Sequence, residues 1–347
     1  MAEHTHIEWT DSTWNVVNGC SVVSPGCTNC YAMRLAGTRL QHHPSRSGLT
    51  QISKAGPVWT GEVRFNDKVL LDPLRWRRPR KIFVCAHGDL FHENVPDEWI
   101  DKVFAVMALC PQHVFQVLTK RPERMRGYMT PRPDECDRPA VGKRLGTAGK
   151  VWNAAFRLVN DKPGIFSRAL DAQGITTEAM PWPLPNVWLG VSVEDQKRAD
   201  ERIPILLDTP AAIRWLSCEP LLGPVDLTAK ENLAERIVRS RIEASTGVRQ
   251  PYRSYLSKID WVIAGGESGP GARPMDEAWA RSLRDQCADA GVPFLFKQWG
   301  AWLPAGQIAA ETGLWNPSCG SPLLTTKKNA GRLLDGVQLD GYPQCLS

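Results

Sequence analysis

Short apolar runs rich in β-branched and aromatic residues recur along the chain, and amphipathic stretches separate them. Runs that are apolar at almost every position indicate strands covered on both faces. Their alternation with helix-like stretches indicates βα units around a parallel sheet. The seven expected strands are residues 14–17, 81–85, 113–118, 186–191, 213–217, 261–264 and 293–296.

The amphipathic stretches between these runs predict helices. Asp97 and Asp276 stand where N-cap residues belong, and Gly291 follows the last helix as a C-cap glycine. An α/β barrel or a doubly wound sheet is therefore expected, and the lack of a G-x-G-x-x-G motif after the first strand disfavours a dinucleotide-binding fold. The expected helices are residues 31–40, 97–109, 122–129, 195–207 and 276–290.

Two segments interrupt this rhythm within residues 1–300, which we expect to form one barrel. Residues 130–185 begin and end Pro-rich and indicate an inserted lobe or lid. Residues 227–258 carry five arginines, either as a solvated helix face or as a phosphate-binding surface. Residues 301–347 are expected to form a tail that packs on the barrel.

Composition narrows the class of protein only slightly. The chain has 347 residues, of which 42% are hydrophobic, and a formal net charge of +5, which permits a nucleic-acid partner without requiring one. No apolar run is long enough for a membrane span and the N-terminus lacks a secretory pattern, so we expect a cytoplasmic protein with no membrane partner. Its thiols should be reduced, with Cys85, Cys110 and Cys218 as packing residues.

Three cysteines near the N-terminus are the main candidate for chemistry. Cys20, Cys27 and Cys30 have the spacing C-x6-C-x2-C in a segment rich in Gly, Pro, Ser and Asn, and the third stands at the expected start of a helix. An iron–sulfur cluster held by three thiolates keeps one iron open to a further ligand. Two alternatives remain, which are three unrelated buried thiols or a zinc site completed by a distant residue. The candidate fourth zinc ligands are His4, His6, His87 and His92.

Polar side chains follow nearly every expected strand. Because ligands of parallel sheets gather at the carboxyl ends of the strands, we expect a deep polar pocket there. Lys120, Glu219 and Lys297 are the candidate catalytic residues. The alternative is that such residues cap the following helices, which is the favoured interpretation for Asp195 and an equal one for Ser268. The candidate cofactor-binding residues are His87, Asp89, Ser192, Glu194, Glu267 and Ser268.

Several short motifs resemble the phage-associated three-Cys-motif family, and the resemblance extends nearly from end to end. The family is in turn similar to the radical S-adenosylmethionine (SAM) superfamily. The motifs are residues 7–11 and 14–15 before the cysteines, then 89–92, 118–122, 190–192, 217–221, 265–269, 296–300 and 330–336.

This resemblance implies a partial or near-complete TIM-like βα barrel whose first loop holds a [4Fe-4S] cluster through three cysteines. Cys20, Cys27 and Cys30 match that placement. In the superfamily the open iron binds SAM, and one electron cleaves SAM to a 5'-deoxyadenosyl radical. The resemblance therefore implies two cofactors, the cluster and SAM.

The sequence departs from the superfamily pattern at two places. The usual cysteine spacing is C-x3-C-x2-C, so the first loop here is three residues longer. The Gly-Gly-Glu element normally follows the second strand, whereas here residues 265–267 follow the sixth expected strand. SAM is therefore expected to be held differently, with His87 or Asp89 near its methionine end.

Two hypotheses on function follow. The first is a radical SAM-like enzyme that acts on a nucleotide, a nucleic acid or another phage-related substrate and needs an electron donor. The second is a zinc- or cluster-stabilised barrel that binds nucleic acid or a partner protein without turnover, which the arginines of residues 73–80 and the 14 tryptophans favour. Some family members are thought to work with a separately encoded partner protein.

Overall fold

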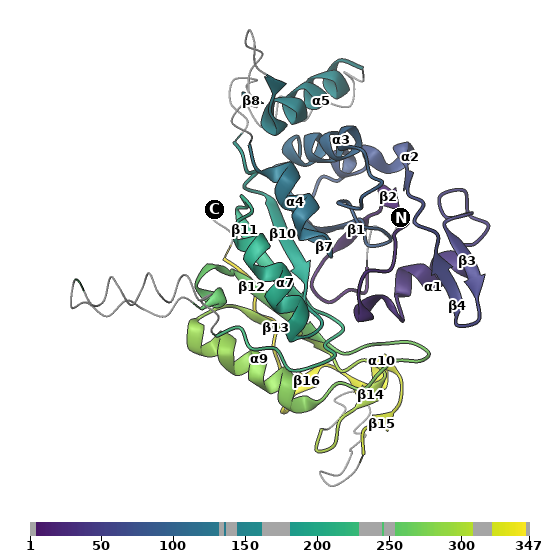
Figure 1. The fold of residues 1–347 in the computed structure, drawn as a ribbon, viewed down its shortest axis with the longest axis vertical. Coiled ribbons are helices and arrows are strands. Elements are labelled where there is room, and N and C mark those ends of the chain that lie inside the picture. Colours follow the sequence, from purple (N-terminus) through teal and green to yellow (C-terminus); the bar gives the residue numbers. More distant parts are fainter. Residues whose placement is uncertain are drawn as a thin grey trace. The chain divides into compact units, whose positions relative to one another are not determined.

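The protein is described by a computed structural model that covers residues 5–131, 135–136, 144–161, 181–228, 245, 254–307 and 321–344 (Figure 1). The chain divides into two compact units. The first contains Met1–Ser192 and Asp208–Arg214, and the second contains Val193–Leu207 and Trp215–Ser347.

The first unit is built on four parallel strands. They are neighbours in the order β1 (Ser12–Trp14), β6 (Lys81–Val84), β7 (Val114–Thr119) and β10 (Val187–Ser192). Every residue of β10 is buried, as expected for a strand covered on both faces. Because the four strands run in the same direction, their carboxyl ends meet at one edge of the sheet.

Smaller elements surround this sheet. Helices α3 and α5 pack against each other, and α1 lies beside the hairpin formed by β3 and β4 (Figure 1). The helices are α1 (Tyr31–Gly37), α2 (Asp67–Leu70), α3 (Asp97–Ala108), α4 (Pro122–Met129) and α5 (Thr147–Asp161), with 3-10 turns at Pro25–Cys27 and Pro73–Arg75. The further strands are β2 (Val17–Asn18), β3 (Thr50–Ser53), β4 (Gly56–Trp59), β5 (Arg64–Phe65), β8 (Glu135–Cys136) and β9 (Arg144–Leu145).

The second unit has three parallel strands in the order β11 (Ile213–Cys218, of which Trp215 onward belongs to this unit), β12 (Trp261–Gly265) and β13 (Phe294–Gln298). Helix α9 (Glu277–Ala290) packs on β12 and β13. The remaining elements are α7 (Gln196–Leu207), a 3-10 turn at Tyr255–Lys258, β14 (Trp302–Leu303), β15 (Leu323–Leu324), α10 (Lys327–Ala330), β16 (Leu333–Leu334) and β17 (Val337–Gln338).

Both predicted caps of α9 are confirmed. The Asp276 side chain accepts a hydrogen bond from the Ala278 N–H, and Gly291 ends the helix with a φ of +67°. The C-terminal segment then pairs with β13, because the Phe296 N–H donates to the Leu339 carbonyl and Leu295 forms an isolated bridge with Asp340.

Three sequence predictions need correction. The expected strand 14–17 is divided between β1 and β2, because Val17 pairs antiparallel with Phe65 of β5 and leaves the parallel sheet. Helix α1 ends at Gly37 rather than at residue 40. Pro96, not Asp97, is the N-cap of α3, because its fixed φ suits the residue that precedes the first helical turn.

The fold is mixed α/β with seven parallel strands among the described residues. Closure into a TIM-like barrel remains a prediction. The helical piece expected near residue 150 forms α5, while most of residues 130–185 and 227–258 lie outside the described residues. Within the described ranges, no helix has the length and apolar character needed to cross a membrane.

Candidate functional site

A pocket of about 140 Å³ lies in the first unit at the carboxyl ends of its parallel strands. Cys20, Cys27 and Cys30 line it together with Lys120, which follows β7, and Ser192, the last residue of β10. Asp89, from the loop after β6, is also part of the wall. The structure thus brings the three motif cysteines to one pocket with three of the predicted strand-end residues, as the sequence predicted for parallel strands.

The cysteine loop is ordered by two short helical elements. Cys27 ends the 3-10 turn Pro25–Cys27, and Cys30 is the N-cap residue of α1. The third cysteine therefore stands at the start of a helix, as predicted. Cys27 is buried, whereas Cys20 and Cys30 are half-buried.

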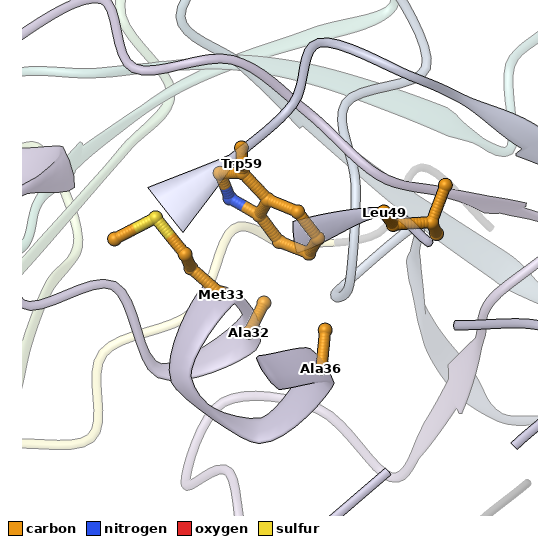
Figure 2. Packing of buried hydrophobic residues seen from close by; sticks show 5 residues of the cluster. All are labelled: Ala32, Met33, Ala36, Leu49 and Trp59. Carbon is orange, nitrogen blue, oxygen red and sulfur yellow. The ribbon is translucent and has the colours of Figure 1, made fainter. Parts of the chain in front are cut away.

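An apolar cluster packs against this loop (Figure 2). Helix α1 contributes one side of the cluster, and Trp59 at the end of β4 forms the other. Cys20 and Cys30 pack against this cluster, so its burial fixes two of the three sulfur-bearing side chains. The members of the cluster are Ala32, Met33, Ala36, Leu49 and Trp59.

Burial favours the protonated form of two of the pocket thiols by raising the pKa of each. It raises the pKa of Cys20 to about 12, and the nearby Asp89 carboxylate adds to this effect while Arg121 opposes it. Burial also raises the pKa of Cys30, against hydrogen bonds from the backbone N–H groups of Met33 and Ala32. Bound metal would reverse this balance, because a coordinating thiol is deprotonated.

The metal-binding side chains that line the pocket are four cysteines, Cys20, Cys27, Cys30 and Cys85, and one carboxylate, Asp89. No group of three or more His, Cys, Asp or Glu side chains in the described ranges is arranged to hold one metal ion. The sulfurs of a zinc site lie within about 4 Å of each other, because each Zn–S bond is about 2.3 Å long. A cluster binds each thiolate to a different iron, so its ligands are spread around a cavity. Three cysteines that line one pocket supply the number of thiolates that a cluster with one open iron needs.

The histidines proposed as zinc ligands have other surroundings. His87 Nδ1 lies 2.6 Å from Arg46 Nη2, and burial followed by the Arg46 charge lowers the His87 pKa to about 4. His92 is buried with Nε2 at 3.0 Å from Ser21 Oγ. His6 is exposed, and His4 lies outside the described residues. His87 is also not among the residues that line the pocket, whereas its neighbours Ala86 and Gly88 are.

Asp89 organises the ends of β6 and β7. Its Oδ1 accepts hydrogen bonds from Thr119 Oγ1 at 2.7 Å and from the Phe91 N–H at 3.0 Å. Its Oδ2 accepts from the Lys120 N–H at 3.2 Å and from Arg121 Nη1 at 3.1 Å. Four donors satisfy a carboxylate, so this buried side chain holds the pocket wall in place.

The other predicted site residues belong to the second unit, where each carboxylate has a cation close by. Glu194 is fully buried and lies 2.9 Å from Arg202 Nη1. Glu267 accepts from the Arg273 backbone N–H at 2.9 Å and from its guanidinium at 2.6 and 2.9 Å. Ser268 is exposed in a loop that starts no helix, so it is not a helix cap.

Glu219 and Lys297, the two candidate catalytic residues of the second unit, form an ion pair. Lys297 Nζ lies 2.8 Å from Glu219 Oε1, in a contact of opposite charges rather than an aligned hydrogen bond. Ser217 Oγ donates to the other carboxylate oxygen at 3.1 Å. Asp195 has the capping role favoured from the sequence, since it accepts from the Arg198 N–H at the start of α7.

The Gly-Gly-Glu element has a packing reason. A Cβ added to Gly266 would lie 2.0 Å from the Trp299 carbonyl oxygen, and one added to Gly300 would lie 2.1 Å from the Glu267 carbonyl oxygen. The loops that follow β12 and β13 are therefore in backbone contact, which only glycine permits. The motif predicted close approach of the backbone to a ligand. In the structure the backbone instead approaches the loop that follows β13.

Sequence reasoning missed two contributors to the pocket. Arg121 lies one residue beyond Lys120 and places a guanidinium nitrogen 3.6 Å from Cys20 Sγ. Cys85, which we expected to be a packing residue like Cys110 and Cys218, is buried but also lines the pocket, with a left-handed φ of +58°. Its position directly after β6 was the available signal, because strand ends face the pocket.

Comparison with known proteins supplies a family but no activity. Neither the curated proteins nor the solved structures contain a match to the chain. A family model described as "Protein of unknown function (DUF5131)" matches residues 4–343. The chain therefore belongs to the DUF5131 family, whose function is uncharacterised.

Proposed function

We propose that the chain is an iron–sulfur protein of the radical SAM type. In this proposal Cys20, Cys27 and Cys30 hold a [4Fe-4S] cluster, and the substrate is a nucleotide, a nucleic acid or another phage-related molecule. The observation that carries it is the sharing of one pocket by the three cysteines at the carboxyl ends of β6, β7 and β10. The resemblance of the short motifs to the phage-associated three-Cys-motif family supports it independently.

The charges around the pocket also favour this proposal. Three thiolates bring three negative charges into a largely buried space, which is costly without positive partners. Arg121 lies 3.6 Å from Cys20, and the Lys120 charge acts on Cys30. Lys120 therefore offsets charge at Cys30, and Arg121 places an N–H donor beside the Cys20 sulfur.

When bound, a cluster with one open iron supplies the electron that cleaves SAM. The chain itself provides the remaining functions. The Asp89 network keeps the end of β7 in place, and Lys120 and Ser192 are available on the pocket wall to orient a polar ligand.

Metal analysis of protein purified without oxygen tests the proposal. We expect a brown protein with about four iron and four sulfide per chain after reconstitution, the composition of the proposed cluster type. Dithionite and SAM should then release 5'-deoxyadenosine and methionine. A colourless protein with one zinc per chain would contradict the proposal.

The second candidate function is a binding protein without turnover. It is favoured by exposed Arg77 and Arg78 in the segment before β6, where Arg80 also stacks on Trp76 at 5.1 Å. A salt-dependent shift of labelled RNA or DNA, together with no cleavage of SAM by cluster-loaded protein, would favour this alternative.

A further inference from the structure

Arg121 joins three segments that meet at the pocket. Nη2 donates to Ser21 Oγ in the cysteine loop at 2.6 Å, and Nη1 donates to Asp89 Oδ2 at 3.1 Å. Nε donates to Glu93 Oε2 at 2.5 Å. The same Nη1 also lies 3.6 Å from Cys20 Sγ, within the range of an N–H···S hydrogen bond. One side chain therefore connects the cysteine loop to the loop that follows β6.

This guanidinium is held in one orientation. Arg121 is only 8% exposed, and its backbone N–H donates to Thr119 Oγ1. Thr119 Oγ1 in turn donates to Asp89. With Asp89 and Glu93 each bound to a different nitrogen of the planar fork, rotation about the terminal bonds would break several charged hydrogen bonds at once. The N–H that points at Cys20 is therefore fixed by the fold.

The positive charge of Arg121 beside Cys20 is offset by neighbouring carboxylates. Asp89 and Glu93 both contact the guanidinium, so two carboxylates offset one positive charge. The Glu93 pKa is lowered to about 2, because hydrogen bonds from Arg121 and Ser21 outweigh the opposing effect of burial. What reaches the sulfur is therefore mainly a directed N–H donor rather than an excess of positive charge.

We propose that Arg121 is a positioning residue of the cysteine site. It holds the segment around Cys20 and Ser21 against the ends of β6 and β7. Its N–H donation to the Cys20 sulfur raises the reduction potential of the bound cluster. This inference rests on the proposed function. Reduction adds negative charge to a cluster and its sulfur ligands, and hydrogen bonds to those sulfurs stabilise the added charge.

The test is a potentiometric titration of the reconstituted holoprotein. Absorption and electron paramagnetic resonance measure the ratio of reduced to oxidised cluster at each potential. At a fixed potential, Arg121→Gln should lower the ratio of reduced to oxidised cluster about tenfold, which corresponds to about 59 mV for one electron. Arg121→Lys should resemble Arg121→Gln more than wild type, because an ammonium keeps the charge but not the fork. Glu93→Gln should raise the ratio, since the guanidinium charge is then less offset.

Arg126→Gln is the matched control. Arg126 lies in α4, the helix that begins directly after Arg121. Its side chain is 43% exposed, and its Nη1 lies 3.6 Å from Asp208 Oδ2. Its loss should leave iron content and reduction potential unchanged. Because Glu93 is 58% exposed, Glu93→Gln is expected to fold even if an Arg121 variant does not.

The outcomes separate this inference from the function on which it rests. If both Arg121 variants bind iron and have the same reduction potential as wild type, the role of Arg121 is rejected and the proposed cluster is retained. If the Arg121 variants lose iron, a shift to a higher ratio in Glu93→Gln supports the role, and an unchanged ratio in that variant rejects it. A wild-type protein without iron rejects the proposed function and this inference together.

Discussion

The carboxyl ends of the parallel strands are polar in both units, but the polar groups are arranged differently. In the second unit the three carboxylates predicted as site residues each have a cation close by, namely Glu194 with Arg202, Glu219 with Lys297 and Glu267 with Arg273. In the first unit four thiols, the three of the motif and that of Cys85, line a pocket beside Lys120 and Arg121.

This difference teaches that a polar residue after a buried strand has two possible meanings. Burial of a charge is costly, and a partner from the same protein can offset that cost as well as a ligand can. Ion pairs within the second unit therefore explain why charged residues follow its strands, without any ligand. Ion pairing does not explain the thiols of the first unit, because neutral cysteine needs no charged partner.

The largest expected effect comes from the cysteine loop. Cys27→Ala should abolish iron binding and the visible absorption of reconstituted protein, because the cluster would lose one of three ligands. Cys110→Ala is the control, since Cys110 is fully buried and does not line the pocket. Retention of the wild-type spectrum in Cys27→Ala would remove the distinction between the two units.

The second prediction concerns the buried pair of the second unit. Arg202→Met removes the guanidinium that lies 2.9 Å from the Glu194 carboxylate, which is 0% exposed. We expect the free energy of unfolding to fall by about 3–5 kcal/mol, measured by urea denaturation, because a buried charge loses a cation that contacts it.

Lys197→Met on the same helix is the control for that variant. Lys197 is 68% exposed and 3.9 Å from Glu201, so its loss should change stability by less than about 1 kcal/mol. Equal effects of the two substitutions would show that Glu194 is not held by Arg202, and would leave Glu194 open to a ligand.

A third prediction tests the glycine contact between the loops after β12 and β13. Gly266→Ala should lower the free energy of unfolding by about 1–3 kcal/mol, because the new Cβ would clash with a backbone oxygen at 2.0 Å. Gly127→Ala in α4 meets nothing within 4 Å and should instead stabilise the protein by up to about 1 kcal/mol. A Gly266→Ala protein as stable as wild type would argue against the packing role of the Gly-Gly-Glu element.

The smallest effect concerns a buried carboxyl of the first unit that contacts a phenol. Tyr128 donates to Asp101 Oδ1 at 2.8 Å, and burial raises the Asp101 pKa to about 6. The folded state therefore holds this proton more tightly than the unfolded state does. Wild-type stability should fall by on the order of 1 kcal/mol as pH rises from about 4 to 6, where only the unfolded state has lost the proton.

Asp101→Asn removes this titration while keeping the oxygen that accepts from Tyr128. Urea denaturation at several pH values between 4 and 7 should show a smaller loss of stability in the variant than in wild type. The same pH dependence in both proteins would mean that burial does not raise the Asp101 pKa.

The local sequence pattern predicted the bounds of an element correctly where residues of that element set those bounds. The helix 122–129 was predicted at its observed bounds, since Pro122 suits the first helical position. Prediction failed where a distant segment competes for the backbone. Val17 pairs with Phe65, so the expected strand 14–17 divides, and no pattern within those four residues indicates it.

The candidate site shows the same division. The sequence predicted that Cys20, Cys27 and Cys30 would share a site, and that Asp89, Lys120 and Ser192 would meet at strand ends. It placed Arg121 after the third expected strand but gave it no role, because the contact with Cys20 joins residues 101 positions apart and depends on how two loops pack. It also gave the carboxylates of the second unit the same weight as the pocket residues.

The sequence by itself determined the α/β pattern, the strand-end positions of the polar residues and the sulfur donor set, because each follows from local spacing and side-chain chemistry. Only the tertiary structure decided which of those polar residues pair with a cation of their own unit and which line the pocket, as Asp89 does while it also pairs with Arg121. The physical reason is that the cost of a buried charge depends on its neighbours in space, and these come from segments far apart in the chain.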